Sequence, residues 1–169
     1  LHFHSRVVLA MTGILIVTGM IAFLATEWHN TQHPYSLGSL PVWQRPLAAF
    51  FQSVTPRTAG FNSIDQASLY DTSKFITVIL MFIGAAPGST GGGIKTTTFF
   101  VLFKSALATL TGKKNIEIKK HTISFKLVDQ AYTIVLFSIS LIFMSAFLLT
   151  ITESDIDFMK ILFEVVSAF

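Results

Sequence analysis

The sequence predicts an all-α membrane protein, because it is apolar, carries few charges and contains two windows long enough to cross a bilayer. Of its 169 residues, 51% are hydrophobic and 12% are charged, and the mean hydropathy is +0.63. Soluble domains usually carry about a quarter charged residues. Residues 7–26 and 131–152 contain no charged side chain, and each window exceeds the roughly 18 residues that indicate a spanning helix.

The distribution of lysines predicts how the chain is oriented in the membrane. Residues 111–127 hold five lysines, whereas the much longer connection at 27–74 holds only three lysines or arginines. By the positive-inside rule, the basic loop at 111–127 is cytoplasmic, and the chain is a multi-pass protein of the cell membrane. A nucleic-acid partner is the weaker interpretation, because membrane segments flank these lysines. The five are Lys113, Lys114, Lys119, Lys120 and Lys126.

Residues 47–55 predict a helix that spans only half of the membrane. The stretch follows Pro46, a favoured residue in a first helical turn, and Pro56 ends it. Its length corresponds to a rise of about 14 Å, half of the hydrocarbon core of roughly 30 Å. The helix dipole would direct its negative end towards a cation held at the C-terminus.

Residues 75–110 predict one crossing that is broken at its middle. The apolar run at 75–86 would rise about 18 Å, which is too little to cross. Pro87 and four glycines then interrupt the run before helix-forming residues resume at Ile94. Unpaired backbone at this depth is tolerated only where protein or a water-filled path surrounds it. We therefore expect part of an ion-conducting protein.

The segment at 57–62 is the predicted ion filter. Its residues Thr58-Ala59-Gly60-Phe61 have the Thr-x-Gly-aromatic order of the strands whose carbonyl oxygens replace the hydration shell of K⁺ in channels. Glycine permits the backbone angles that turn carbonyls towards an axis, and the aromatic ring could pack behind the strand. The four-residue match is weak alone, with a plain turn as the alternative. The half helix before it and the crossings around it favour the filter.

Two basic side chains near the predicted ion path require an explanation. Arg57 would repel K⁺ unless it turns away, so we expect it behind the strand, bound to carbonyls or to an acid such as Asp65. Lys95 would lie within the membrane, where a central charge costs about 2.5–3.5 kcal/mol. We expect its ammonium to reach the cytoplasmic edge, the water path, or a carbonyl or carboxylate partner. With Arg57, the predicted filter support includes Asn62, which ends the segment, and Glu164, which could brace a filter from behind.

No enzyme chemistry is predicted, and no metal site beyond K⁺ at the filter carbonyls. The sequence contains no nucleophile–base arrangement and no cysteine, which excludes disulfides and thiolate metal sites. His29 and His33 are four residues apart and could share a helix face. Because they lie in a proline-bordered loop, we expect both to face solvent.

The glycine-rich loop, residues 85–93, admits three interpretations. Gly88 and Gly93 have the separation found in phosphate-binding loops, but Ile94 intrudes before Lys95 and would rotate the lysine off a phosphate. Close helix packing through small residues is the second interpretation. We favour the third, a gating loop that must move for ions to pass. Its residues are Ala85, Ala86, Pro87, Gly88, Ser89, Thr90, Gly91, Gly92 and Gly93, together with Lys95.

A second copy of this pattern begins late in the chain. Phe51-Gln52-Ser53-Val54-Thr55 matches Phe163-Glu164-Val165-Val166-Ser167 in character at every position except Ser53, at an offset of 112 residues. The order of long helix, half helix and returning helix thus begins twice. The equivalent of Thr58 would be residue 170, so we expect a piece of a larger protein. The predicted parts are a helix–pore-loop–helix repeat at 1–112 (helix 7–26, pore helix 47–55, filter 57–62, broken helix 75–110), a basic loop at 113–127, and a partial repeat at 128–169 (helix 131–152, pore helix 158–169).

Two stretches resemble the Trk/Ktr/HKT superfamily of K⁺ transporters, and most of all the membrane subunit of bacterial Ktr systems. They are residues 54–62 (VTPRTAGFN) and 82–95 (FIGAAPGSTGGGIK). The resemblance implies a K⁺-channel-like architecture of four helix–pore-loop–helix repeats in one polypeptide, of which this chain has the third and part of the fourth. It places the central filter glycine at Gly60 and the gating loop at 85–93. Two repeats and the fourth filter strand are absent, so this piece cannot enclose a pore alone.

The resemblance also implies partners that neither composition nor spacing reveals. They are a lipid bilayer, a second copy in a homodimer, and a cytoplasmic ring of regulatory subunits that bind nucleotides, including NAD. Na⁺ would stimulate or accompany K⁺ as in a symporter. One alternative is a secondary transporter whose broken helix binds an anionic or other small solute at the helix start at 94–96. A membrane-anchored nucleotide-binding protein is the other, and Ile94 disfavours it.

Overall fold

The computed structural model describes residues 3–112, 117–118, 121–122 and 124–169. These residues form six α-helices, two short 3₁₀ helices and one small hairpin. Four of the five lysines of the basic loop lie outside the described residues, at positions 113, 114, 119 and 120. The elements are α1 (Phe3–Glu27), η1 (Leu37–Ser39), α2 (Arg45–Val54), η2 (Gln66–Ser68), α3 (Asp71–Phe82), α4 (Thr96–Leu110), β1 (Glu117–Ile118), β2 (His121–Thr122), α5 (Phe125–Thr152) and α6 (Phe158–Ala168).

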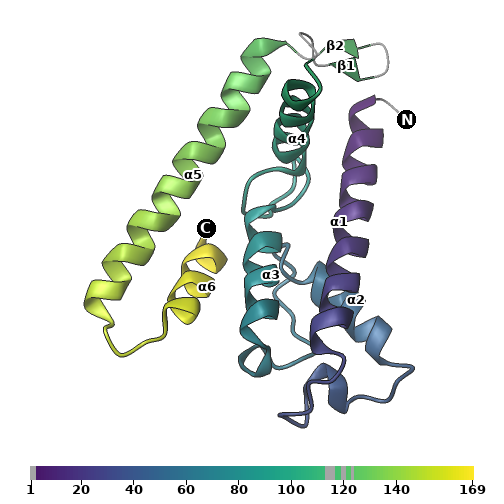
Figure 1. Ribbon diagram of the computed structural model, residues 1–169, viewed down its shortest axis with the longest axis vertical. Helices are drawn as coiled ribbons and strands as arrows, with labels where there is room; N and C mark the ends of the chain where they lie inside the picture. The colour runs from purple at the N-terminus through teal and green to yellow at the C-terminus, as the bar shows by residue number, and fades with distance from the viewer. Residues whose placement is uncertain (1–2, 113–116, 119–120, 123) are drawn as a thin grey trace.

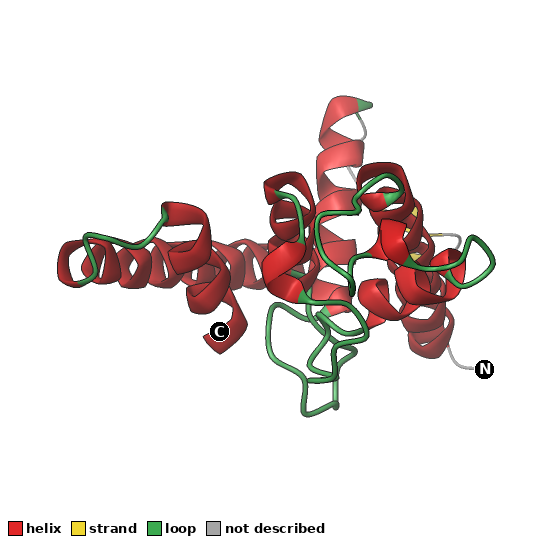
Figure 2. Ribbon diagram, turned by 90° about the horizontal axis from the view of Figure 1, so that it is seen from below, coloured by secondary structure: helices red, strands yellow, loops and turns green. Residues whose placement is uncertain are grey.

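The helices run roughly along the long axis of the molecule. Helix α1 lies beside α3 and α4, which follow one another along that axis, and α5 is inclined away from them (Figure 1). Helix α2 packs against α1, and α6 packs between α3 and α5. Seen from below, a group of loops projects from one side of the helices (Figure 2).

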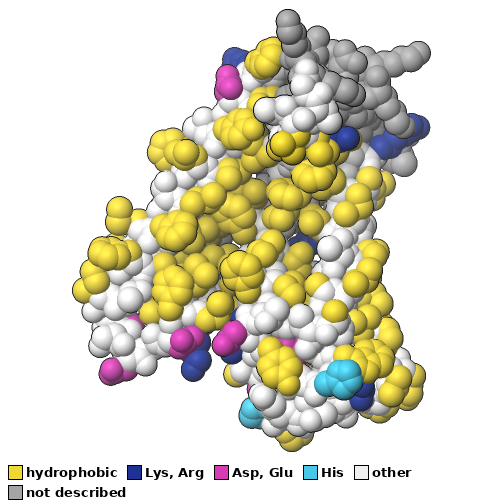
Figure 3. Space-filling model, viewed as in Figure 1, with side chains coloured by type: hydrophobic (Ala, Val, Ile, Leu, Met, Phe, Trp, Pro, Cys, Tyr) yellow, Lys and Arg dark blue, Asp and Glu magenta, His cyan; other side chains and the backbone are white. Residues whose placement is uncertain are grey.

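Two of these helices are long and apolar enough to cross a bilayer. They cover residues 4–27 and 125–152, and only 22% and 17% of their most apolar windows are buried. A core helix of a soluble protein would be mostly buried, so these surfaces fit a lipid environment instead. Figure 3 shows hydrophobic side chains over the middle of one face and most charged side chains towards its two ends. The chain is an all-α membrane protein, as the sequence predicts.

The long helices begin earlier than the apolar windows predict. Helix α1 starts at Phe3 and α5 starts at Phe125, because each continues through polar residues such as Arg6 and Lys126 that precede its window. Hydropathy marks the part of a helix that suits the bilayer, and it does not mark where helical hydrogen bonding begins.

The two half-length helices form close to their expected positions. Helix α2 begins at Arg45, with Pro46 in its first turn, and ends at Val54. Helix α6 begins at Phe158, where the side chain of Asp157 accepts a hydrogen bond from Met159 N at 3.1 Å. Neither is long enough to cross a bilayer core.

The broken crossing has a wider break than the sequence predicts. Helix α3 ends at Phe82, so residues 83–86, expected to be helical, are not. Ile83 and Ile94 instead form a parallel bridge, and Ile94 N donates to Phe82 O at 2.9 Å. Both isoleucines are buried, at 6% and 3% exposure. The ends of the break are therefore joined by main-chain hydrogen bonds and apolar packing, which the local sequence does not reveal.

Helices α1 and α2 approach closely at Gly19. Ser53 Oγ donates to Ile16 O at 2.8 Å, which ties α2 to α1. A Cβ at Gly19 would collide with Ser53 Oγ and would lie 3.0 Å from Leu80 Cδ1 of α3. Glycine at this position therefore lets three helices meet.

A buried polar cluster joins the end of α1 to the start of α3. Glu27 Oε2 accepts a hydrogen bond from Asn30 Nδ2 at 2.5 Å, and its Oε1 accepts one from Tyr70 N at 3.0 Å. Asn30 Nδ2 also donates to Ser68 O at 2.9 Å. Glu27 and Asn30 are completely buried, so these bonds fix the segment that connects α2 to α3.

The contact at Gly19 gives a matched pair of substitutions in one helix. Gly19→Ala should destabilise the protein by about 1–3 kcal/mol, the range for overpacking, because the new methyl group displaces Ser53. Gly13→Ala should be neutral or stabilising, by up to about 1 kcal/mol, because it removes a helix-interior glycine and no atom lies within 4 Å of the added Cβ.

Thermal unfolding of the detergent-solubilised protein measures both effects. A midpoint for Gly19→Ala equal to that of Gly13→Ala would show that the α1–α2 contact does not depend on the absence of a side chain.

Candidate functional site

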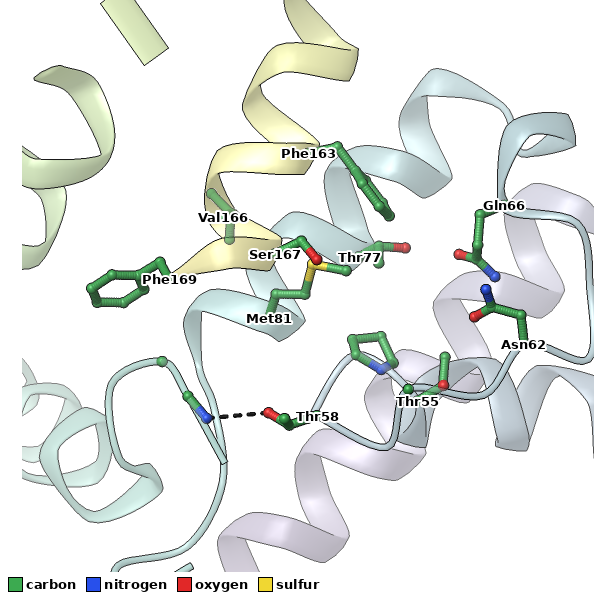
Figure 4. A pocket seen from close by; sticks show the side chains of 14 residues that line it. Thr55, Thr58, Asn62, Gln66, Thr77, Met81, Phe163, Val166, Ser167 and Phe169 are labelled. Atoms are coloured by element: carbon green, nitrogen blue, oxygen red, sulfur yellow. Dashed lines mark hydrogen bonds between the residues drawn. The ribbon is translucent and has the colours of Figure 1, made fainter. Parts of the chain in front are cut away.

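A cavity of about 290 Å³ lies between the end of α2, helix α3, the end of α6 and the glycine-rich loop. Thr55, Thr58 and Gln66 line one side of it, and α6 contributes Phe163 and Ser167 on another (Figure 4). Residues of three separate parts of the chain thus meet at the predicted filter. The side chain of Asn62 lies beside that of Gln66 on the same wall (Figure 4).

The backbone of the predicted filter is not helical. Thr58 has a φ angle of 66° and Gly60 one of 76°. Positive φ is ordinary for glycine but is an outlier for a β-branched residue such as threonine. Among the described residues, no hydrogen bond reaches the carbonyl oxygens of Thr58, Ala59 and Gly60, and all three residues are exposed. Three consecutive carbonyls are therefore available to a ligand.

The sequence suggested that the Phe61 ring could pack behind the strand. The structure differs, because Phe61 is 73% exposed. Its carbonyl oxygen instead accepts a hydrogen bond from Thr55 Oγ1. The segment is thus attached to the end of α2 through its main chain and not through the aromatic ring. That bond also occupies the Phe61 carbonyl, which leaves residues 58–60 as the free part of the predicted filter.

Two glutamines that the sequence analysis missed hold the segment after the filter. Gln52 and Gln66 exchange two side-chain hydrogen bonds, of 2.8 and 2.9 Å, and Gln52 is completely buried. Gln66 Nε2 also donates to Ile64 O at 3.1 Å. The sequence did contain a signal that could have identified Gln52 as a functional residue. The 112-residue offset pairs it with Glu164, so a polar residue occupies the same position in both apolar half helices.

Glu164 lies apart from the cavity that contains Thr58. It is exposed on α6 and lines a different hollow, together with Leu141 and Ser145 of α5. Its predicted role in supporting a filter concerns a strand that follows α6, so it stays a prediction.

Arg57 turns towards α1, behind the predicted filter. Its Nη1 donates to Thr12 O at 3.5 Å, and Arg57 does not line the cavity. Its Nε and Nη2 atoms are buried without a partner among the described residues. Of the two kinds of partner predicted for Arg57, the structure shows a carbonyl, and no ion pair with Asp65 is present among the described residues. Asp65 instead accepts a hydrogen bond from Ala67 N at 3.1 Å and caps η2. Proximity in the sequence does not place the two side chains together across this turn.

The glycine-rich loop is held together from within. Lys95 Nζ donates to Gly91 O at 2.6 Å and to Ser89 O at 3.5 Å. The lysine therefore has the carbonyl partners that a charge at this depth needs. Ser89 Oγ donates to Ala86 O at 2.6 Å, and an added Cβ at Gly84 would collide with the carbonyl of Gly92.

One hydrogen bond joins the predicted filter to this loop. Gly92 N donates to Thr58 Oγ1 at 3.1 Å (Figure 4). The two residues are 34 positions apart, and no sequence pattern indicates that they meet. By contrast, His29 and His33 do not line the cavity, and both are exposed in the connection between α1 and α2, as the sequence predicts.

The sequence matches one protein family over its whole length. The match covers residues 1–169 and is to the TrkH family, described as a cation transport protein. The chain is 40% identical over 169 residues to Ktr system potassium uptake protein B of Vibrio alginolyticus, a match that covers 100% of this chain and 36% of that protein.

Two further relatives agree with this match. Ktr system potassium uptake protein B of Bacillus subtilis is 40% identical over 166 residues, which are 98% of this chain and 36% of that protein. Potassium/sodium uptake protein NtpJ of Enterococcus hirae is 38% identical over 171 residues, covering 98% of this chain and 37% of that protein. The chain thus spans little more than a third of the length of these curated relatives. It belongs to the TrkH family of cation transport proteins.

Proposed function

We propose that this chain is part of the pore-forming subunit of a potassium uptake system. The observation that carries the proposal is the row of free carbonyl oxygens at Thr58, Ala59 and Gly60, which follows a half-length helix in a membrane protein. Carbonyl oxygens of this kind replace the water shell of K⁺ in filters. Relatives named as potassium uptake proteins support K⁺ as the ion.

The local electrostatics of the segment suit a cation. Helix α2 ends at Val54, directly before the predicted filter, so the negative end of its dipole is near the free carbonyls. The guanidinium of Arg57 lies on the opposite side, against α1. Thr58 and Gly60 have positive φ angles and Ala59 between them does not.

The glycine-rich loop would act as the gate of this path. It lies against the predicted filter through the bond between Gly92 and Thr58. The cavity beside Thr58 is bounded on this side by Gly92 and Gly93. An ion leaving the filter on that side would meet the loop, so flux would depend on the position of the loop.

The whole transporter would supply what this chain lacks. In the proposed arrangement, residues 1–112 form one helix–pore-loop–helix repeat, residues 128–169 begin the next, and further repeats of the same polypeptide complete the pore. The protein would lie in the cell membrane as a homodimer, with the loop at 111–127 facing the cytoplasm and a nucleotide-binding regulatory ring there. The relatives' names support a multi-component Ktr system, and the name of NtpJ supports a role for Na⁺.

The central glycine of the filter gives the first test of this function. Gly60→Ser should weaken the preference for K⁺ over Na⁺ in the full-length protein, because a side chain at a φ of 76° forces the carbonyl strand to rearrange. Gly112→Ser is the matched control. Gly112 has a φ of 66°, has open space around it and lies after α4, away from the filter.

Relative permeability or uptake of K⁺ and Na⁺ in cells that lack other K⁺ systems measures the result. Both variants carry a similar backbone cost, so only a filter role separates them. Equal ion preference in the two variants would refute the filter assignment.

Deletion of residues 88–93 tests the gate. The deletion removes the part of the loop that contacts Thr58 and should raise K⁺ flux and blunt its regulation from the cytoplasm. Flux measured in membrane vesicles, with and without the regulatory partner, gives the answer. Wild-type flux together with wild-type regulation would leave the loop with a packing role alone.

A further inference from the structure

We propose that the Thr58 hydroxyl is a positioning group that couples the glycine-rich loop to the filter backbone. The inference rests on the proposed function of the 57–62 segment and adds a specific link to it. With the loop in the observed position, Gly92 N donates to Thr58 Oγ1 at 3.1 Å. Movement of the loop away from the filter must break this bond and release the residue that begins the row of free carbonyls.

Thr58 has a conformation that its surroundings must maintain. A β-branched residue at a φ of 66° is a steric outlier, and such residues persist only where neighbouring contacts fix them. Its main chain is flanked by the bond from Ala59 N to Thr55 O at 3.2 Å. The side-chain bond to Gly92 is the contact that connects this conformation to a movable segment.

The loop reaches Thr58 because it carries no side chains at the point of contact. A Cβ at Gly91 would lie 2.5 Å from Ala85 Cβ and 3.4 Å from Thr58 Oγ1. A Cβ at Gly92 would lie 3.1 Å from the carbonyl oxygen of Phe169, at the end of α6. Gly92 thus fits between the filter strand and the second half helix, which fixes where its amide can point.

The coupling therefore works in both directions. A loop held against the filter stabilises the left-handed conformation of Thr58, and that conformation presents the hydroxyl to the loop. A displaced loop leaves the Thr58 hydroxyl without the Gly92 N–H group that donates to it, so the first carbonyl of the row is free to turn. Flux control and ion preference would then change together when the loop moves.

Substitutions at position 58 separate the hydroxyl from the shape of the side chain. Thr58→Val keeps the branched shape and removes the acceptor, whereas Thr58→Ser keeps the acceptor and removes one methyl group. Thr133→Val is the matched control, because the Thr133 hydroxyl bonds only to Asp129 O of its own helix, at 2.8 Å, among the described residues. All variants are made in the full-length protein, in lipid nanodiscs.

Amide hydrogen exchange of the peptide that contains Gly92 reports the bond directly. Exchange should be faster in Thr58→Val by about two- to tenfold, the shift expected from the loss of one neutral hydrogen bond. It should stay at the wild-type rate in Thr58→Ser and Thr133→Val. Equal exchange in the valine and serine variants would overturn the proposal. If the valine variant does not accumulate, Thr58→Ala replaces it, because alanine also lacks the acceptor.

Potassium flux in the unstimulated state tests the coupling itself. Thr58→Val should raise this flux by a similar factor relative to Thr58→Ser, which keeps the acceptor. Faster exchange with unchanged flux would show that the bond exists without coupling, and would overturn the inference while the proposed function stands. A wild-type protein that carries no K⁺ would overturn the proposed function, and with it any role of Thr58 in flux.

Discussion

A peptide group at membrane depth must find a hydrogen-bond partner or face water, and the structure around the broken crossing follows from this constraint. The break between α3 and α4 satisfies much of its own backbone. Ile94 N bonds to Phe82 O, Thr96 N bonds to Ala85 O, and Lys95 covers the carbonyl of Gly91. The 58–60 carbonyls lack such partners among the described residues. The break between α3 and α4 therefore satisfies its backbone internally, as the proposed gate requires, whereas residues 58–60 leave their carbonyls free, as the proposed filter requires.

The fold also depends on close approach between segments, which is possible because glycine has no side chain at the points of contact. Gly19 lets α1 meet α2 and α3, and Gly84 lets the two ends of the break lie against each other. Gly92 brings the loop between Thr58 and the end of α6. Each contact joins segments far apart in the chain, so the half helix and the loop are positioned by packing and not by their own propensities.

The sequence predicts the elements well and their tertiary contacts poorly. Hydropathy and prolines suffice to find the long and half-length helices, since those signals act within one turn or one window. The break starts at Ile83 because this residue forms a bridge to Ile94. The apolar character of residues 83–86 predicts a continued helix and gives no sign of that bridge. Tertiary contacts likewise decide that Arg57 binds the carbonyl of Thr12 and not Asp65, and local sequence did not reveal that Phe61 is exposed. A carbonyl partner was one of the alternatives predicted for Lys95, because a charge within a bilayer is costly, and the structure shows that alternative.

The bridge between Ile83 and Ile94 has a mechanical consequence. It closes the base of the break, so the residues between behave as a side loop on an otherwise continuous rod. Such a loop can change shape without altering the distance between α3 and α4, and the lipid-facing surface of the crossing stays constant while it does. As the proposed gate, such a loop would move few atoms and leave the bilayer unperturbed, so its rate of opening should depend little on membrane thickness.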